Sequence, residues 1–371
     1  MKNRGVRTPA CSVHTHVNAS GAHDKTCSQE CEYGTCVRHV SRRLFLAAPA
    51  LLWTARAATV QPLGIAKDSL PVHAFKDTIE MLEHCHSLGA AGLQTTLSSL
   101  EPDYLKRLRA RADEFGMYLE VQGGLPRQDA ALFDRQVAAA REIGARCIRC
   151  ACLGGRRYET FSTLADWEKF VADSHAAIER AIPIVEKHRI PLALENHKDW
   201  TAEEMGALLK KYGSEYLGVC LDTGNNMALL DDPMETVRLL APFAVTTHIK
   251  DMAVEEYPDG FLLSEVPLGQ GILDMKAIVQ TIAAARPKAS MTLEMITRDP
   301  LKIPCLTDKY WATFPQRNGK YLAAAVVRVR QHRTKLPTVS DLPRKAKLVR
   351  EDENIKQSLG YFRDRLSEPR A

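Results

Sequence analysis

Short apolar runs alternate with longer amphipathic stretches from Gln61 onward. The runs fit buried β-strands and the stretches fit helices, because their hydrophobic period is about 3.6 residues. The predicted strands are 62–66, 92–96, 117–122, 146–152, 192–195, 218–222, 244–248 and 291–294. The predicted helices are 77–88, 102–115, 131–143, 164–188, 202–212, 233–240 and 275–285. Eight strands alternating with helices favour parallel βαβ units that close into a single-domain (β/α)8 barrel over residues 61–314.

The chain changes character after residue 314. Residues 321–333 have the pattern of an amphipathic helix, residues 334–350 are rich in Lys, Arg and Pro, and residues 351–366 have the pattern of a charged helix. We therefore expect residues 315–371 to supply an eighth outer helix and a C-terminal extension.

Four polar residues stand at the downstream ends of the last four predicted strands: Glu195, Asp222, His248 and Glu294. In a parallel barrel the C-terminal ends of all strands meet at one mouth, so these side chains are expected to converge. A single carboxylate at a strand end often caps the next helix, but four ligand-type residues in series are hard to explain by capping. Three carboxylates and one imidazole suit one divalent cation, Mn²⁺, Mg²⁺, Co²⁺ or Zn²⁺.

Other polar residues near predicted strand ends are candidates for contact with a substrate. His197 lies two residues beyond Glu195 and shares its face in an extended segment, so it is a candidate for hydroxyl contact or proton transfer. The alternative for His197 is a hydrogen-bonded loop residue. Arg298 could bind an acidic group or pair with Asp299. The candidate substrate-binding residues are Glu120, Arg149, Asn225, Lys250 and Arg298.

Local strings around the four ligands resemble the xylose isomerase-like barrel superfamily, the sugar phosphate isomerase/epimerase group, over roughly residues 61–314. The strings are Leu194-Glu195-Asn196-His197, Leu221-Asp222-Thr223-Gly224-Asn225, Thr247-His248-Ile249-Lys250-Asp251, Leu293-Glu294-Met295 and Val266-Pro267-Leu268-Gly269-Gln270-Gly271 with Asp274. The resemblance implies one divalent cation held by Glu195, Asp222, His248 and Glu294. It also implies that Glu195 and Glu294 act as the acid–base pair.

A divalent cation in such a site can polarise a sugar carbonyl and stabilise an enediolate, which predicts a sugar isomerase or epimerase. One residue departs from the resemblance, because Asn225 stands where many of these isomerases and epimerases carry a His. Asn cannot shuttle a proton, so a lyase, dehydratase or decarboxylase acting on a keto-sugar or keto-sugar acid is the alternative. A non-catalytic carbohydrate-binding protein is the alternative from another class. The three-zinc endonucleases of the superfamily are disfavoured, because their additional His and Asp ligands are missing.

The N-terminal region looks like a leader. Ser41-Arg42-Arg43-Leu44-Phe45-Leu46 resembles a twin-arginine export signal, and Ala55-Arg56-Ala57 offers small residues for cleavage. Residues 1–57 are thus predicted to direct export to the periplasm or another extracytoplasmic space, and a basic amphipathic leader helix is the alternative. Cys11, Cys27, Cys31 and Cys36 with four nearby His residues could form a zinc knot, but their irregular spacing favours an extension without a packed core.

Charge and composition limit the classes of partner that the chain is expected to bind. Residues 1–57 hold eight of the 50 basic and three of the 45 acidic residues, which leaves 42 of each sign, so the body gives no indication of nucleic-acid binding. No apolar run approaches the roughly 20 residues of a membrane span, so we expect no membrane insertion after processing. The expected partner is a small-molecule carbohydrate substrate, and the sequence leaves open whether the chain forms a homo-oligomer. Cys147 and Cys150 should point to opposite sides of a strand, as buried residues rather than a redox pair.

Overall fold

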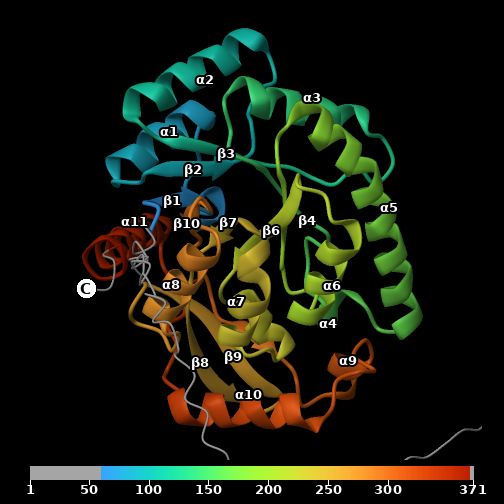
Figure 1. Cartoon of the computed structure of the whole chain (residues 1–371). Coiled ribbons are helices and arrows are strands. Elements are labelled where there is room, and N and C mark those ends of the chain that lie inside the picture. The colour runs from blue at the N-terminus through green and yellow to red at the C-terminus, as the bar shows by residue number, and fades with distance from the viewer. Residues whose placement is uncertain (1–59, 368–371) are drawn as a thin grey trace, which may run out of the picture. The chain divides into compact units, whose positions relative to one another are not determined.

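The computed structural model describes residues 60–367. The predicted leader, its export signal and its Cys/His tract lie outside these residues and stay predictions. Eight parallel strands form one sheet at the centre of the molecule (Figure 1). They are β1 (Leu63–Ala66), β2 (Gly92–Thr95), β3 (Tyr118–Gln122), β4 (Ile148–Ala151), β5 (Leu192–Glu195), β6 (Leu217–Asp222), β7 (Ala244–His248) and β10 (Met291–Leu293).

The sheet closes on itself, which confirms the predicted (β/α)8 barrel. The strand order runs from β10 through β1 to β7 with every neighbouring pair parallel. The seam between β7 and β10 is bridged where Ile249 N donates to Thr292 O at 2.7 Å and Glu294 N donates to Ile249 O at 3.1 Å. Closure at this seam brings Glu294 beside the end of β7.

Helices surround the barrel close to the predicted bounds. They are α1 (Thr78–Ser87), α2 (Pro102–Phe115), α3 (Ala131–Glu142), α5 (Leu164–His188), α6 (Ala202–Tyr212), α7 (Pro233–Leu240) and α8 (Met275–Ala285). Local signals set their ends: the Asp77 carboxylate caps α1, and Thr201 with Glu204 forms a capping box on α6. Gly116 ends α2 in the left-handed region, at φ 64°.

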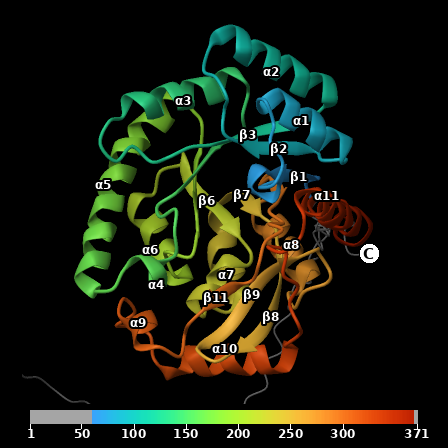
Figure 2. The same cartoon turned by 180° about the vertical axis from the view of Figure 1, so that it is seen from behind.

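A small antiparallel sheet, formed by two strands between β7 and α8 and a third strand after β10, was not predicted. It contains β8 (Asp251–Tyr257), β9 (Gly260–Val266) and β11 (Leu301–Ile303), with β9 in the middle. Tyr257 pairs with Gly260, so Pro258 and Asp259 form a two-residue turn. A Cβ on Gly260 would collide with the Ile303 carbonyl, so glycine is required there. Figures 1 and 2 both show α10 (Gly319–His332) lying along this sheet.

The eighth outer helix is α11 (Arg344–Tyr361), which continues as a π-helical turn to Leu366. Its Ile355, Leu359 and Phe362 belong to the same hydrophobic core as the barrel strands. The helix α10 instead lies against β8, and its Ala325 and Val329 belong to a separate core with residues of β8, β9 and β11. The helix α11 starts within the Lys- and Arg-rich stretch, seven residues before the predicted start, because Pro343 provides a helix entry and the exposed first turn tolerates charge.

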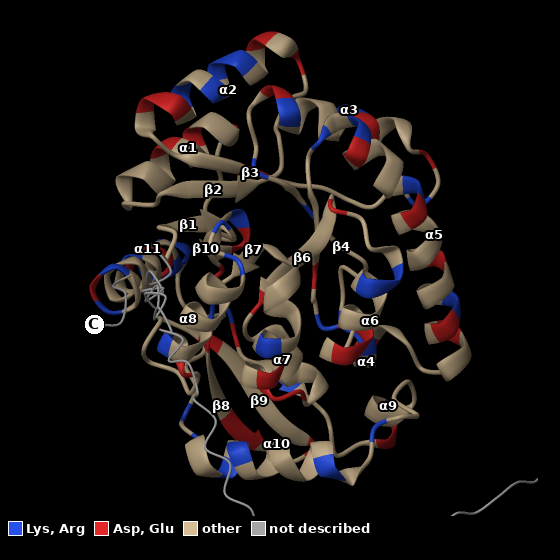
Figure 3. Cartoon of the chain, in the orientation of Figure 1, with Lys and Arg blue, Asp and Glu red and all other residues tan. Residues whose placement is uncertain are grey.

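The described cysteines are Cys85, Cys147, Cys150, Cys152, Cys220 and Cys305, all free and buried. Cys147 packs with Ala193 and Cys220, whereas Cys150 lies in the main barrel core, which confirms that the two point apart. Within residues 60–367, no helix combines the length and the apolarity that a membrane crossing requires. Lys/Arg and Asp/Glu are interspersed on outer helices such as α2 and α5 (Figure 3).

Candidate metal centre

The four predicted ligands come together at the C-terminal mouth of the barrel. Glu195, Asp222 and His248 are the last residues of β5, β6 and β7, and Glu294 directly follows β10. One ligand atom from each lies within 4.8 Å of the others. All four residues are buried, with at most 3% of their surface exposed. The barrel thus gathers three carboxylates and an imidazole from four strands into one water-poor cluster.

A hydrogen bond to Gln94 orients the His248 ring. Its Nε2 lies 2.7 Å from Gln94 Oε1, while Gln94 Nε2 donates to Glu120 Oε2 at 2.9 Å. The Gln94 oxygen is therefore the acceptor, so His248 Nε2 carries a proton and Nδ1 is the ring nitrogen that can bind a cation. Nδ1 has no hydrogen-bond partner in the described structure and lies 3.5, 3.7 and 3.3 Å from oxygens of Glu195, Asp222 and Glu294.

These distances fit the edges of a metal coordination shell. Ligands bound at about 2.1 Å lie roughly 3 to 3.5 Å apart in tetrahedral or octahedral geometry. Burial opposes a charged ring, yet neighbouring groups that include Cys220, Glu294 and Asp222 raise the pKa of His248 to about 10. The cluster therefore favours a positive charge beside Nδ1, either a proton or a cation that displaces it. The residues present therefore fit a divalent cation, with one His nitrogen and three carboxylate oxygens as donors.

Neighbouring groups orient the ligand carboxylates. Asp222 Oδ1 accepts from the N–H groups of Gly224 and Asn225 at 2.9 and 2.7 Å, which leaves Oδ2 facing the cluster. Glu195 Oε1 accepts from Asn225 Nδ2 at 3.0 Å, and Arg149 pairs with Glu195 Oε2. These contacts hold the ligands in place before any ion binds, as the outer shell of a metal site does.

Lys250 places a buried ammonium group beside the ligands. Its Nζ lies 2.9 Å from Asp222 Oδ2 and also contacts Glu294 Oε2. Burial disfavours ionisation of all three groups, yet the ammonium holds the pKa of Asp222 and Glu294 below their usual values. The carboxylates raise the pKa of Lys250 in turn. Lys250 therefore stays charged and pairs with two of the three ligand carboxylates.

Gln94→Leu is expected to weaken divalent-cation binding by about 10- to 100-fold, because the His248 ring loses the acceptor that fixes its tautomer. Competition with a fluorescent chelator would measure the dissociation constant. The matched control is Thr292→Val, which touches Glu120 at 3.4 Å but not His248. Equal affinity in Gln94→Leu and the control would show that the ring does not depend on Gln94.

A cavity of about 520 Å³ opens above the cluster. Glu294 lines it, so the cavity reaches the predicted cation site. Its size suits a small-molecule ligand. A hollow of about 700 Å³ lies elsewhere, between α5, α6 and residues 313–321, and none of the four ligands lines it. Besides Glu294, the charged or imidazole side chains that line the cavity of about 520 Å³ are Lys67, Asp68, Arg149, Arg156, His197, Lys198 and Arg298.

His197 lines the cavity as a neutral imidazole. Its Nδ1 lies 2.9 Å from the Leu153 carbonyl and must donate to it, which leaves Nε2 as an acceptor. Burial, together with the positive Lys198 and Arg149, lowers the pKa of His197 to about 3. This arrangement suits contact with a substrate hydroxyl better than proton storage.

Lys198 is a functional candidate that sequence reasoning missed. It follows His197 at a positive φ of 61° and is 3% exposed. Its Nζ donates to Asn225 Oδ1, and within residues 60–367 it has no carboxylate at ion-pair distance. Burial and repulsion from Lys250 lower the pKa of Lys198 to about 7. The signal in the sequence was the polar run Asn196-His197-Lys198-Asp199 directly after a ligand.

The other predicted substrate-binding residues divide into two groups. Arg149 and Arg298 line the cavity, and Arg298 pairs with Glu265 at 2.5 Å rather than with Asp299. Asn225 and Lys250 are each 1% exposed and lie beneath the cavity wall, where Asn225 Oδ1 accepts from Lys250 Nζ at 3.2 Å. They contact the ligand carboxylates, and Asn225 also contacts Lys198, from the side facing away from the cavity.

The structure does not support substrate contact by Glu120. The residue is 1% exposed and is absent from the cavity wall. Its carboxylate accepts from Gln94 and from Thr246 Oγ1, at 2.9 and 2.8 Å, inside the barrel. Glu120 lies two residues before the end of β3, one inward-facing layer deeper than Gln122, which does reach the cavity. Its place is behind Gln94, in the chain of contacts that orients His248.

Comparisons with known proteins agree with this fold. The family profile described as xylose isomerase-like TIM barrel matches residues 82–313. The 3-oxo-isoapionate decarboxylase of Pectobacterium atrosepticum is 30% identical over 243 residues, covering 64% of this chain and 79% of that protein.

Solved structures share the architecture at low identity. The 3-keto-D-glucoside 4-epimerase YcjR of Escherichia coli matches with a TM-score of 0.52 and 13% identity, covering 71% of this chain and 98% of that one. The D-psicose 3-epimerase of Clostridium cellulolyticum H10 matches with a TM-score of 0.50 and 17% identity, covering 73% and 98%. At these identities the likeness concerns the fold.

Proposed function

The chain belongs to the xylose isomerase-like TIM barrel family, and we propose that it is a divalent-metal-dependent decarboxylase of a keto-sugar acid. The observation that carries this proposal is Lys198, a buried amine in the cavity wall without a carboxylate partner among the described residues. A substrate carboxylate would supply the missing negative charge. The 30% identical relative is a 3-oxo-isoapionate decarboxylase, and its activity supports the same class of reaction.

The charge of the cavity also favours an acidic substrate. Five Lys or Arg side chains line it, against the two carboxylates Asp68 and Glu294. Four of the five have carboxylate partners: Lys67 with Asp68, Arg149 with Glu195, Arg156 with Glu159 and Arg298 with Glu265. Lys198 is left to bind an incoming anion, and such binding would favour its protonated form.

The reaction we propose breaks the bond between a carboxylate carbon and a carbon adjacent to a ketone. CO₂ leaves, and the electron pair of the broken bond moves into the neighbouring carbonyl. A bound divalent cation would supply electrostatic stabilisation for the negative charge that develops on the carbonyl oxygen. Lys198 then donates a proton to the carbon that lost CO₂ and regains one from water, so one proton is consumed for each CO₂ released.

Other residues hold the substrate for this step. The neutral His197 accepts a hydrogen bond from a sugar hydroxyl through Nε2. Arg149 and Arg298 contribute positive potential at the cavity wall while remaining paired with Glu195 and Glu265. Asn225 fixes Lys198 through Oδ1 and Glu195 through Nδ2, so one neutral amide couples the proton donor to a ligand. Its neutrality, unexpected for an epimerase, suits this positioning role.

The second candidate is a metal-dependent sugar isomerase or epimerase. Glu195 and Glu294 both approach the predicted cation site, from different strands, so two carboxylates flank the place where a substrate carbonyl would bind. Arg149 and Lys250 pair with them, and Lys250 lowers the pKa of Glu294 although burial opposes it. An ionised Glu294 suits a general base better than a general acid.

The two candidates are separated by incubating the metal-loaded chain with sugars, 3-keto sugars and 3-oxo sugar acids in D₂O. We expect CO₂ to be released and one deuterium to be incorporated at the carbon that lost it. Infrared spectroscopy would detect the CO₂, and NMR would detect the deuterium. Deuterium incorporation without CO₂ would favour the epimerase, and binding without any exchange would favour a carbohydrate-binding protein.

Lys198→Met should lower kcat/KM for the active acid by about 100-fold or more, the usual scale for loss of a general acid. The matched control Lys67→Met removes a lining lysine that is paired with Asp68 and should change kcat/KM far less. Equal losses in both variants would contradict the role of Lys198.

A further inference from the structure

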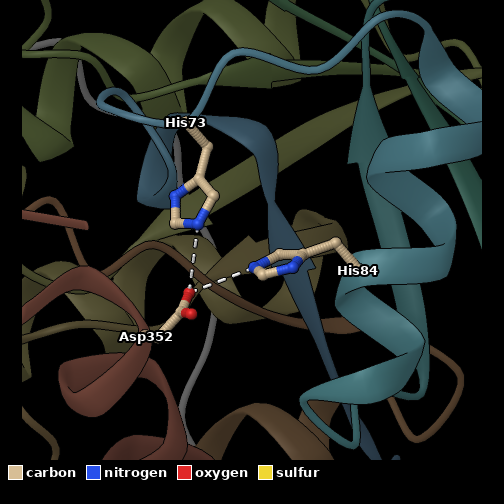
Figure 4. A group of neighbouring side chains, drawn as sticks. All are labelled: His73, His84 and Asp352. Carbon is tan, nitrogen blue, oxygen red and sulfur yellow. Dashed lines mark hydrogen bonds and ion pairs between the residues drawn. The ribbon is translucent and has the colours of Figure 1, made fainter. Parts of the chain in front are cut away.

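A second group of metal-ligand side chains lies between the first and the last outer helix of the barrel. His73 follows the 3-10 turn after β1, His84 belongs to α1 and Asp352 belongs to α11. In Figure 4 the three side chains point toward one another from these three segments. His84 Nε2 lies 3.1 Å and His73 Nε2 lies 3.4 Å from the same oxygen, Asp352 Oδ1. The ligand atoms all lie within 4.8 Å of one another.

A buried carboxylate orients the first of these rings. His73 Nδ1 lies 2.8 Å from Glu351 Oε2, and the other oxygen of Glu351 accepts from Val72 N at 2.8 Å. The Glu351 side chain is fully buried, so this contact is a fixed part of the fold. With Nδ1–H donating to Glu351, a neutral His73 directs the Nε2 lone pair at Asp352. A lone pair and a carboxylate oxygen at 3.4 Å repel each other unless a positive charge lies between them.

We propose that His73, His84 and Asp352 bind a transition-metal ion of the Zn²⁺ type. Two imidazole nitrogens and one carboxylate oxygen form a donor set that suits Zn²⁺, and the observed separations match edges of a tetrahedron with bonds of about 2.1 Å. Glu351 supplies the carboxylate that usually supports a zinc-bound histidine from behind. The barrel-mouth cluster has three carboxylates and one imidazole instead, so the two sites differ in their preference for soft and hard ions.

The location indicates a structural role. His84 and Asp352 are 268 residues apart in sequence, so an ion here would tie the C-terminal helix α11 to the first βα unit. The three side chains are 14%, 23% and 28% exposed, which lets the ion exchange with solvent. Because such an ion binds the folded chain and not the unfolded one, it stabilises the fold by mass action. The proposal is independent of the chemistry at the barrel mouth.

The test compares full-length variants stripped with a chelator and dialysed against limiting Zn²⁺, with zinc counted by mass spectrometry. Glu294→Gln serves as the background, because it removes a ligand from the other cluster. We expect Glu294→Gln/Asp352→Asn to bind one equivalent less than Glu294→Gln. All variants keep the same Cys and His residues in 1–57, so the difference isolates this site. Loaded with Co²⁺, Glu294→Gln should also show visible absorption bands that the double variant lacks.

Folding and specificity need their own controls. His84→Gln on the same background should lose the same equivalent, and His86→Gln should not, because His86 stacks on Phe115 outside the cluster. Chelator should lower the melting temperature of Glu294→Gln by several degrees but leave that of the double variant unchanged. Circular dichroism would confirm that the variants are folded. Equal zinc content and equal chelator response in the two backgrounds would overturn the proposal and leave His73 as a protonated partner of Glu351 and Asp352.

Discussion

Replacing Glu294 with Gln is expected to remove one equivalent of Mn²⁺ and to lower kcat/KM at least about a thousandfold. Glu294 Oε1 is the carboxylate oxygen nearest to His248 Nδ1, at 3.3 Å, and this carboxylate also lines the cavity. A bound cation contributes several kcal/mol of charge stabilisation, and every 1.36 kcal/mol is about a tenfold change in rate. Gln keeps the shape of Glu but lacks the negative charge that attracts the ion. Mn²⁺ titration followed by electron paramagnetic resonance measures the binding.

The matched control for this variant is Glu265→Gln. Glu265 is a buried carboxylate in the same network, paired with Arg298 at 2.5 Å and 3.7 Å from Lys250 Nζ, but it is not one of the four ligands. It should retain the Mn²⁺ equivalent even if its activity falls. If Glu294→Gln binds Mn²⁺ as tightly as the unchanged chain, the four residues do not form the metal site.

The barrel and its ligand cluster could be predicted because both follow from local patterns. A short apolar run that ends in Glu, Asp or His predicts a buried strand. It also predicts that the terminal side chain lies at the C-terminal end of that strand, at the mouth of the barrel. Glu195, Asp222 and His248 occupy the last position of their strands, and parallel closure brings such positions to one mouth. Glu120 shows the limit of this argument, since it shares the inward face of β3 but stands one layer lower.

Features created by contacts between distant segments could not be predicted. The hairpin of β8 and β9 follows Lys250 directly, and its Pro258-Asp259-Gly260 turn was the available local signal. Lys198 owes its properties to burial beside Asn225 and to repulsion from Lys250, which no periodicity records. Likewise, the contact of α11 with the first helix joins residues far apart in sequence. Local pattern thus located the cluster of candidate metal ligands, whereas the charged groups that would select a substrate depend on tertiary structure.

Replacing Lys250 with Met is expected to destabilise the chelator-treated protein by about 3 to 5 kcal/mol, the usual cost of leaving a buried charge without its partner. The Lys250 ammonium lies between Asp222 Oδ2 and Glu294 Oε2 and is 1% exposed. Without this ammonium, the buried carboxylates of Asp222 and Glu294 repel each other, and His248 is the remaining group beside both that can carry a positive charge. The melting temperature should fall by roughly 5 to 10 °C. Saturating divalent cation should recover most of this loss, because the ion supplies the same positive charge.

The same substitution should tighten cation binding by about tenfold or more, since an ion entering the site no longer meets a competing ammonium. Lys198→Met is the matched control, a buried lysine without a carboxylate partner in the described structure. Burial and Lys250 lower the pKa of Lys198 from 10.5 to about 7, so folding releases a proton between these pH values. Stability of the unchanged chain should therefore rise with pH across that window, and Lys198→Met should remove the rise without loss of stability at neutral pH. If Lys250→Met melts at the same temperature as the unchanged chain after chelation, Lys250 does not balance the ligand carboxylates.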